Sequence, residues 1–341
     1  WFTASWLFGY DVAGDYYQWT KVAKIYFMSF VALALLHTRS HIMIFTWVTV
    51  MSLAFLSIKG GFFTIVTGGA HRVWGPTGSF IADNNHLALA TIITIPMMHF
   101  LQLRLRAGWP RHLMSVAMLL SVASALGSQS RGALLALIAT GAMFWLRSSR
   151  KGSTAILLLI CLVVLVPMMP DTWWDRMNTI QDYQQDESAM GRINGWLVAI
   201  EVAKHNLFGG GMSYQHQYYF SIYGVYNRDV IAAHSIYFQI LGNHGFIGLF
   251  FYLGIWVSTF GVANRLRKLA KVDGSLHWAG DLGAMVQVSL VAYAVGGAFL
   301  SMPYFDLPYN LMIMVVLAYK WASKPVEERR HKEVIDVWPF R

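Results

Sequence analysis

The sequence predicts an all-α protein, a bundle of helices that crosses a membrane several times. Of its 341 residues, 56% are hydrophobic and only 13% are charged, against about 25% charged residues in a typical soluble domain. Mean hydropathy is positive, at +0.45. The apolar residues form continuous runs instead of alternating with polar ones, which indicates helices and not strands. A disordered chain, a disulfide-stapled secreted module and an ordinary cytosolic enzyme are thereby excluded.

Apolar runs that could span the membrane occur along the whole chain. Crossing the hydrocarbon takes roughly 20 residues of helix, somewhat fewer where the ends snorkel. Several of the runs are marginal in length. We expect nine spans, near residues 22–37, 41–58, 86–103, 112–127, 132–146, 153–169, 236–263, 282–301 and 304–322.

The positions of Lys and Arg give the orientation of these spans. Alternate connections and the C-terminal tail hold 17 of the 26 basic residues, and the positive-inside rule makes that side cytoplasmic. The net charge of +9 therefore belongs to short clusters beside anionic headgroups, not to one nucleic-acid-binding patch. These basic residues are Arg39, Arg104, Arg106, Arg111, Arg147, Arg150, Lys151, Arg265, Arg267, Lys268, Lys271, Lys320, Lys324, Arg329, Arg330, Lys332 and Arg341.

The chain reads as a single membrane domain over 1–341, with two outward insertions. One insertion is the glycine-rich stretch 59–85, and the other is the long stretch 170–235. Because Trp1 opens within an apolar segment, we expect further spans to precede this numbering. The single cysteine, Cys161, cannot form an internal disulfide.

The insertion 170–235 is long for a connection without structure or function of its own. The adjacent tryptophans of Asp171–Arg176 are typical of a segment in the membrane interface. Apolar residues recur at helical intervals within Ser188–His205, which predicts an amphipathic helix with Ser188 as its N-cap. Its predicted apolar stripe consists of Ile193, Trp196, Leu197, Ile200 and Ala203.

Arg192 falls in the first turn of this helix or just after it, where a cation opposes the helix dipole. A bound anion would meet backbone N–H groups and the guanidinium together. The alternative is an ion pair with Asp186 or Glu187. Three glycines follow the helix. Gly210 and Gly211 among them could form an anion-binding nest, although a simple helix terminator fits the pattern better.

His234 and Ser235 open the next apolar segment, nine residues ahead of Gly245 and Gly248. At ~100° per residue, an unbroken helix would place His234 and both glycines on one face. Small residues there would let another helix approach closely. Histidine titrates near neutrality, so His234 is the best candidate for a general base on the outward side. The alternative is a structural histidine at the membrane surface.

Further polar residues lie on the outward side. Arg131 sits in a serine- and glycine-flanked turn, where it either snorkels to headgroup phosphates or binds a ligand. Arg72 and Asn85 border a span within 59–85, and Asn85 could simply cap the following helix. No metal, P-loop or dinucleotide signature occurs, so we expect no metal or cofactor. Two arginines and a neutral base suit a diphosphate leaving group on a lipid.

The stretch His234–Gly248, HSIYFQILGNHGFIG, resembles the signature of the bacterial O-antigen ligase and O-antigen polymerase superfamily. The stretches 71–89 and 187–192 are similar to the subgroup of exosortase-associated O-glycosylation ligases. The resemblance runs from about residue 20 to 265. Further stretches agree with the superfamily in the same order, at 128–135, 191–196 and 208–211.

The resemblance implies a GT-C-like glycosyltransferase in the bacterial inner membrane, with its active site on the periplasmic side. Such enzymes move a preassembled glycan from undecaprenyl diphosphate to an acceptor, without a metal. Arg131 and Arg192 match the family's essential arginines, and His234 matches its essential histidine. Ser235 belongs to the motif and could serve as a helix-end hydrogen bonder. The expected partners are the lipid-linked donor, the lipid A–core acceptor and membrane lipids, with no nucleic acid.

Other functions stay open at this point. Within the superfamily, the chain could be an O-antigen polymerase or a ligase that transfers glycans to protein, because the histidine motif does not encode the acceptor. A different class is a flippase or transporter for lipid-linked sugars. That class would need inward-facing polar residues within the spans, and the apolar runs do not show them.

Overall fold

The computed structural model divides the chain into two compact units. Unit 1 comprises Trp1–Met28, Arg176–Val257 and Gly297–Phe305. Unit 2 comprises Ser29–Asp175, Ser258–Gly296 and Asp306–Arg341. The structure describes all residues except 149–150, 166, 168, 179–186, 227–228 and 330–341.

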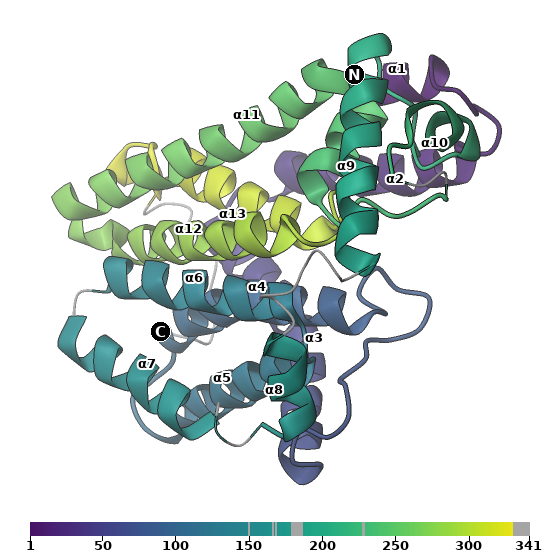
Figure 1. Cartoon of the computed structure of the whole chain (residues 1–341). Coiled ribbons are helices and arrows are strands. Elements are labelled where there is room, and N and C mark those ends of the chain that lie inside the picture. Colours follow the sequence, from purple (N-terminus) through teal and green to yellow (C-terminus); the bar gives the residue numbers. More distant parts are fainter. Residues whose placement is uncertain (149–150, 166, 168, 179–186, 227–228, 330–341) are drawn as a thin grey trace. The chain divides into compact units, whose positions relative to one another are not determined.

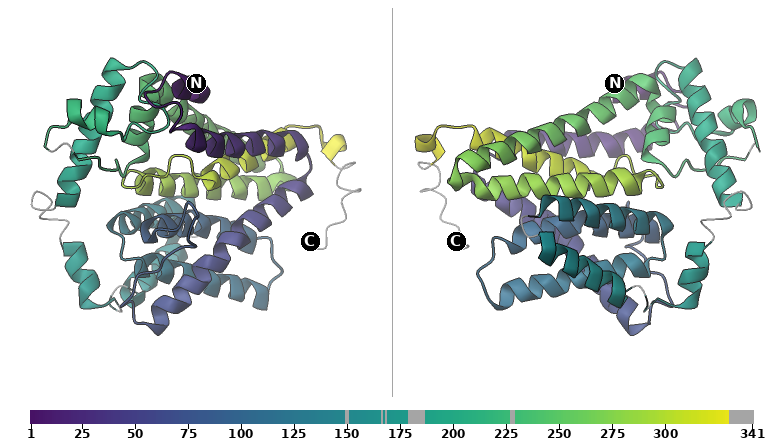
Figure 2. Two further views of the ribbon diagram at one scale, coloured as in Figure 1. Left: turned by 90° about the vertical axis from the view of Figure 1, so that its right-hand side faces the viewer. Right: turned by 60° about the vertical axis from the view of Figure 1, so that its left-hand side comes forward.

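Helices make up the fold, and the described residues contain no strand (Figures 1 and 2). Each of the nine apolar runs predicted from the sequence lies on a helix, so the all-α class is confirmed. Those helices are α2 (Tyr16–Leu35), α3 (Arg39–Val66), α4 (Asn84–Gln102), α5 (Trp109–Gly127), α6 (Arg131–Arg147), α7 (Lys151–Leu165), α11 (Ile236–Val272), α12 (His277–Gly297) and α13 (Asp306–Ala322). The shorter helices are α1 (Phe2–Leu7), α8 (Asp171–Asn178), α10 (Gln217–Tyr223) and the 3₁₀ turn η1 (Gly274–Leu276). The longer helix α9 (Glu187–His205) lies between α8 and α10 in the chain.

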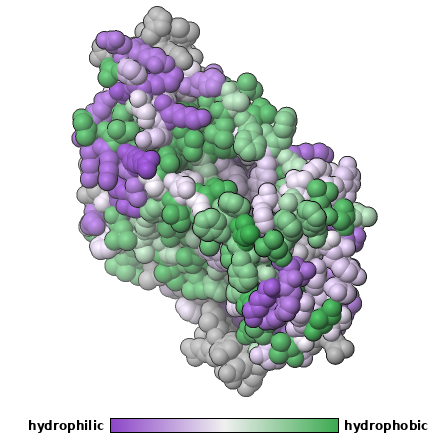
Figure 3. Space-filling view, turned by 90° about the horizontal axis from the view of Figure 1, so that it is seen from above, coloured by the Kyte–Doolittle hydropathy of each residue, from purple (hydrophilic) through white to green (hydrophobic). Residues whose placement is uncertain are grey.

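Three stretches of helix in the described part of the chain have the length and apolarity of membrane spans. They are Arg39–Val66, Ile236–Val272 and Gly274–Gly297. Apolar side chains stand exposed along α3 and α11, as expected where lipid is the solvent. Figure 3 shows broad apolar surface in one view. Exposed examples are Val48, Phe55, Phe62 and Val66 on α3, and Phe246, Phe250, Phe251 and Val257 on α11. The protein is therefore a membrane protein.

Small residues let α3 and α5 pack closely in unit 2. A Cβ added at Gly61 would overlap the Leu120 carbonyl, and one added at Gly127 would overlap the Thr64 hydroxyl. Close backbone approach at small residues is typical of helix pairs in membranes. The expectation that an outward loop begins at residue 59 is wrong, because α3 continues to Val66 and its glycines serve this helix contact.

Buried polar side chains also connect the helices of unit 2. The hydroxyls of Ser57 on α3 and Thr91 on α4 lie 3.0 Å apart. The Ser289 hydroxyl of α12 donates to a carbonyl of α4 at 2.7 Å, and the Gln287 amide donates to Asn264 of α11 at 2.8 Å. Such interhelical hydrogen bonds add to van der Waals packing where helices cannot rely on the hydrophobic effect.

The basic residues predicted to lie on one side of the membrane meet at one end of the unit 2 bundle. Arg104, after α4, forms an ion pair with Asp281 near the start of α12. Arg39, at the start of α3, has its guanidinium 5.3 Å from the ring centre of Trp278, which also lies on α12. The start of α3, the end of α4 and the start of α12 therefore meet at this end, and its cytoplasmic assignment stays a prediction. Outside the described residues lie Arg150, Arg330, Lys332 and Arg341.

Candidate functional site

His234 is held in an unusual backbone conformation directly before α11. Its φ is 44°, in the left-handed region that residues other than glycine rarely adopt. Its N–H donates to the Ser301 hydroxyl at 3.0 Å. The carbonyl of the preceding residue, the fully buried Ala233, accepts the indole N–H of Trp196 at 2.7 Å. The main chain on both sides of the histidine is thus fixed, while its side chain stays half-buried.

The segment before His234 lies along α9, the helix that carries Arg192. A Cβ added at Gly191 would come within 2.7 Å of the Ile231 side chain, and one at Gly195 within 3.7 Å of the Ala233 Cα. Trp196, which bonds to Ala233, follows Arg192 by four residues. That spacing corresponds to about 6 Å along the helix axis and about 40° around it. Unit 1 therefore packs the helix that carries Arg192 against the segment that leads into His234.

The face that α9 buries differs from the predicted one. Ile193, Trp196, Leu197 and Ile200 are only half-buried, and of the predicted stripe Ala203 alone is buried. Small side chains instead form the contact, because they allow the glycine-lined face to approach the segment at Ile231. The helix also begins at Glu187, so the prediction of Ser188 as its N-cap is wrong. The buried face consists of Gly191, Asn194, Gly195, Val198, Ala199, Val202 and Ala203.

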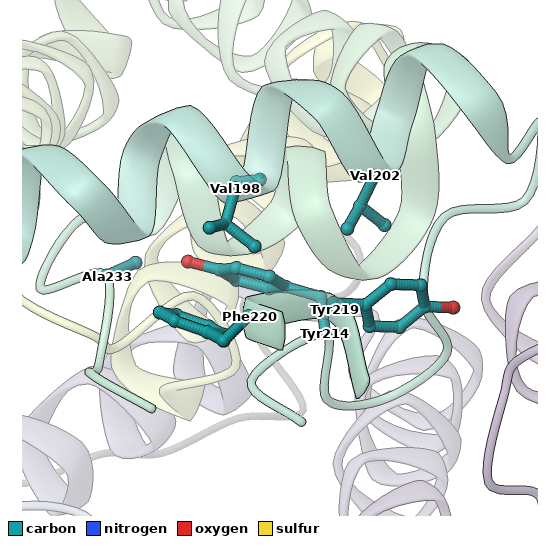
Figure 4. Packing of buried hydrophobic residues seen from close by; sticks show 7 residues of the cluster. Val198, Val202, Tyr214, Tyr219, Phe220 and Ala233 are labelled. Carbon is teal, nitrogen blue, oxygen red and sulfur yellow. The ribbon is translucent and has the colours of Figure 1, made fainter. Parts of the chain in front are cut away.

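A buried cluster attaches α9 to the rest of unit 1. Figure 4 shows Val198 and Val202 of α9 beside the rings of Tyr214, Tyr219 and Phe220. The Tyr214 hydroxyl donates to the Gly195 carbonyl at 3.0 Å. Burial raises the pKa of this phenol well above its usual range, so it stays a neutral donor. The cluster fixes the helix that carries Arg192. The full set of buried members is Val198, Ala199, Val202, Tyr214, Tyr219, Phe220 and Ala233.

The three glycines after α9 pack against a break in α11. Gly245 has φ 68° and ψ −174°, which is not helical. Carbonyls just ahead of such a break lose their partners in the next turn. Gly210 and Gly211 supply the missing donors: their N–H groups bond to the carbonyls of Gly242 and Asn243 at 2.8 and 3.1 Å. Those two N–H groups are in use, so the structure does not support the anion-nest interpretation.

The expectation of one unbroken helix from His234 through Gly248 is wrong. His234 precedes α11, and the break at Gly245 removes the common face. Both glycines still mark close contacts. A Cβ at Gly245 would lie 2.5 Å from the Leu207 carbonyl oxygen, and one at Gly248 would lie 3.2 Å from the Trp1 indole.

Ser235 and the residues just before the break hold the two ends of the first part of α11. Buried Ser235 accepts the first helical bond through its carbonyl, from the N–H of Gln239 at 2.9 Å. The buried Asn243 amide accepts the Tyr214 N–H at 2.9 Å and donates to the Tyr304 hydroxyl at 2.9 Å. That hydroxyl lies 2.7 Å from Nε2 of buried His244. The sequence analysis missed this network, because Asn243 and His244 lie within the quoted signature but Tyr304, 60 residues after His244, lies outside it.

In unit 2, Arg131 is the first residue of α6, and the Ser130 hydroxyl caps that helix by accepting the Ala133 N–H at 3.2 Å. Gln129, two residues earlier, has a φ of 55°. Its side chain donates to the Gly69 carbonyl at 3.0 Å, and Arg72 Nε donates to its amide oxygen at 3.5 Å. Unit 2 thus connects Arg72, through Gln129, to the turn that carries Arg131.

Asn85 lies beside this turn but does not cap α4. Asp83 is the N-cap, and its carboxylate accepts the backbone N–H of Asn85 at 2.8 Å and its side-chain amide at 2.9 Å. Asn84 is buried and donates to the Ser128 carbonyl at 2.7 Å. The structural partner of the arginine turn is therefore Asn84, the residue before Asn85.

Comparison with known families covers two parts of the chain. Residues 116–253 match a family model described as O-antigen ligase, and this range contains Arg131, Arg192 and His234. Residues 5–105 match a family of unknown function. No curated protein matches the chain. Among the described residues, no three His, Cys, Asp or Glu side chains gather as metal ligands.

Proposed function

We propose that the chain is an O-antigen ligase, because residues 116–253 match the family model described as O-antigen ligase. Its donor is a preassembled glycan on undecaprenyl diphosphate, and its acceptor is lipid A–core oligosaccharide. The protein works in the bacterial inner membrane, with the reaction on the periplasmic side. His234 acts as the base, and Arg131 and Arg192 bind the diphosphate.

One observation supports this proposal: the helix that carries the proposed cation packs, within one unit, on the segment that leads into the proposed base. Trp196, one turn after Arg192, bonds to the carbonyl next to His234. An imidazole and a guanidinium at adjoining positions can serve an acceptor hydroxyl and a phosphate in the same reaction. Arg131 is assigned to the diphosphate by its match to the family pattern and by its place at the N-terminus of α6, which favours anions.

The reaction proceeds as a direct displacement. His234 takes the proton of the acceptor hydroxyl, and the acceptor oxygen bonds to the anomeric carbon. The bond between that carbon and the diphosphate oxygen breaks, and its electron pair stays on the diphosphate. The two guanidinium groups stabilise the developing charge. Attack opposite the lipid inverts the anomeric centre. The imidazolium then releases its proton to water, and the polyprenyl chain leaves sideways into lipid.

The test is transfer by the purified protein in lipid nanodiscs, with undecaprenyl-diphosphate-linked glycan and a panel of acceptors. Product on lipid A–core supports the ligase. Product only on a second lipid-linked glycan identifies a polymerase, and product only on a protein identifies a protein ligase. Movement of intact donor between leaflets without covalent product identifies a flippase. Transfer should persist in EDTA, and strict dependence on Mg²⁺ would contradict the metal-free scheme.

The roles of the residues are tested by matched substitutions. His234→Ala should lower transfer about 10²–10⁴-fold, the usual contribution of a general base. His205→Ala is its control, because His205 lies exposed at the end of α9. Arg192→Lys should also be severely impaired, since a point charge does not replace a planar, bidentate fork. Full activity of His234→Ala would reject the assignment of the base.

A further inference from the structure

The first part of α11, residues 236–244, is held at both ends by one segment far away in the sequence. That segment, Gly297–Phe305, belongs to the same unit. At the start of α11, a Cβ on Gly297 would come within 2.5 Å of the Ile236 side chain, so that side chain packs directly on the Gly297 backbone. At the end, Tyr304 bonds to Asn243. A short, stiff helix fixed at both ends can hold the residue before it in place.

In the middle of the segment, Ser301 contacts His234 itself. The Ser301 hydroxyl accepts the His234 N–H at 3.0 Å. His234 needs such support, because a left-handed conformation in a residue other than glycine costs of the order of 1 kcal/mol or more. The N–H lies before the first turn of α11, so the helix gives it no partner. Ser301 therefore helps to keep the histidine in its unusual conformation.

At its end, the segment is anchored by Tyr304, three residues after Ser301. Its hydroxyl accepts the Asn243 amide at 2.9 Å and lies 2.7 Å from His244 Nε2. Tyr304, Asn243 and His244 are all buried, with exposures of 3%, 0% and 4%. Asn243 also donates to the Met212 carbonyl at 2.8 Å. Charge-free, fully buried hydrogen bonds of this kind exclude water and hold one geometry.

We propose that Ser301 is a positioning residue for His234, with Tyr304 as the anchor that sets its place. This role rests on the proposed function of His234 as the base. Without the Ser301 hydroxyl, the His234 backbone relaxes towards ordinary φ values and turns the imidazole away from the acceptor hydroxyl. A misplacement of about 1 Å in a reacting group can cost about 10²-fold in rate. Binding of the donor depends on the arginines, so it should change little.

The experiment measures kcat and KM for glycan transfer by the purified protein in nanodiscs. Ser301→Ala should lower kcat about 10- to 100-fold and leave KM for the lipid-linked donor within about twofold. Ser301→Thr keeps the hydroxyl and should restore most of kcat. Tyr304→Phe should lower kcat in the same way, though less. Ser57→Ala is the matched control: it loses a buried hydroxyl contact between helices, to the Thr91 hydroxyl in unit 2, and should retain wild-type kcat.

Several results would overturn the role of Ser301. Wild-type kcat in both Ser301→Ala and Tyr304→Phe would do so. Equal losses of kcat in Tyr304→Phe and Ser57→Ala would also do so, since general destabilisation would then explain both. If Ser301→Ala cannot be purified, the comparison of Tyr304→Phe with Ser57→Ala decides alone. The proposed function fails separately: an active His234→Ala rejects the base, whereas an inactive His234→Ala with wild-type Ser301→Ala and Tyr304→Phe rejects only the positioning.

Discussion

Gly245→Ala tests whether the break in α11 is built into the fold. Gly245 has φ 68° and ψ −174°, a combination that is essentially restricted to glycine. An added Cβ would lie 2.5 Å from the Leu207 carbonyl oxygen and 3.3 Å from the Gly209 nitrogen. The obstacles are backbone atoms, so they cannot move aside as a flexible side chain could. Alanine therefore either strains the break or straightens the helix.

Both responses are costly. Keeping the break requires alanine in a disfavoured conformation, about 1–3 kcal/mol, in addition to the overlap. Straightening the helix separates the carbonyls of Gly242 and Asn243 from the N–H groups of Gly210 and Gly211, at about 1 kcal/mol for each hydrogen bond. Against this stands a gain of roughly 0.5–1 kcal/mol for alanine over glycine in a regular helix. Straightening is the less costly response, so we expect a net destabilisation of about 1–1.5 kcal/mol for unit 1.

The assay is thermal unfolding in detergent together with glycan transfer. Gly254→Ala is the matched control, because Gly254 lies on the same helix and an added Cβ there meets nothing within 4 Å. Gly254→Ala should be as stable as wild type or slightly more so. Gly245→Ala should unfold several degrees earlier and lose transfer, since the part of α11 next to His234 is displaced. Equal stability and activity in the two variants would refute the reasoning.

Three further predictions concern other supports of the fold. Asn84→Ala should lower stability by about 1–3 kcal/mol, measured by thermal unfolding, because it leaves the buried Ser128 carbonyl without its donor; wild-type stability would contradict this. Gly61→Ala should destabilise the α3–α5 contact, since its Cβ overlaps the Leu120 carbonyl, and a stabilised variant would show that the helices can separate without cost. Burial raises the pKa of Asp15 above its ordinary 3.8, although two backbone N–H groups that donate to its carboxylate lower it. A carboxyl whose pKa is raised in the folded state stabilises the protein at pH below the ordinary pKa, and this contribution is lost as the pH rises. The melting temperature of Asp15→Asn relative to wild type should therefore be higher at pH 7 than at pH 4. The opposite trend would contradict the sign.

Hydropathy and charge were sufficient to predict the helices of unit 2. Each apolar run became a helix, because a continuous apolar stretch has few other ways to satisfy its backbone in lipid. The ends of the runs were less predictable. The helix predicted to stop near residue 58 continues to Val66, because Gly60 and Gly61, which look like loop residues, instead allow α3 to approach α5. From the sequence alone, a glycine pair in a turn cannot be distinguished from a glycine pair in a helix contact.

Unit 1 shows where local patterns stop being informative. The motif around His234 predicted the family that residues 116–253 match. Helical periodicity could not show that α11 breaks at Gly245, since the break depends on donors from Gly210 and Gly211. The stripe on α9 was placed on the wrong face for a related reason. Bulky residues were expected inside, whereas the small residues Gly191 and Gly195 allow the closest contact. Both features arise from tertiary contacts that no short window contains.

The turn before Arg131 and the turn at His234 share one backbone feature, a positive φ at a residue other than glycine. Within the described residues, Gln129 and His234 are the two positions other than glycine with positive φ. One lies two residues before Arg131, and the other is the proposed base. Such conformations persist only where surrounding contacts hold them, and both are held by side chains: Gln129 by its own bonds to Gly69 and Arg72, and His234 by Ser301. If strain at these turns served only to fit the chain together, a substitution that relieves it should raise the free energy of unfolding and leave glycan transfer unchanged. A loss of transfer with an unchanged or higher free energy of unfolding would assign the strain to the reaction.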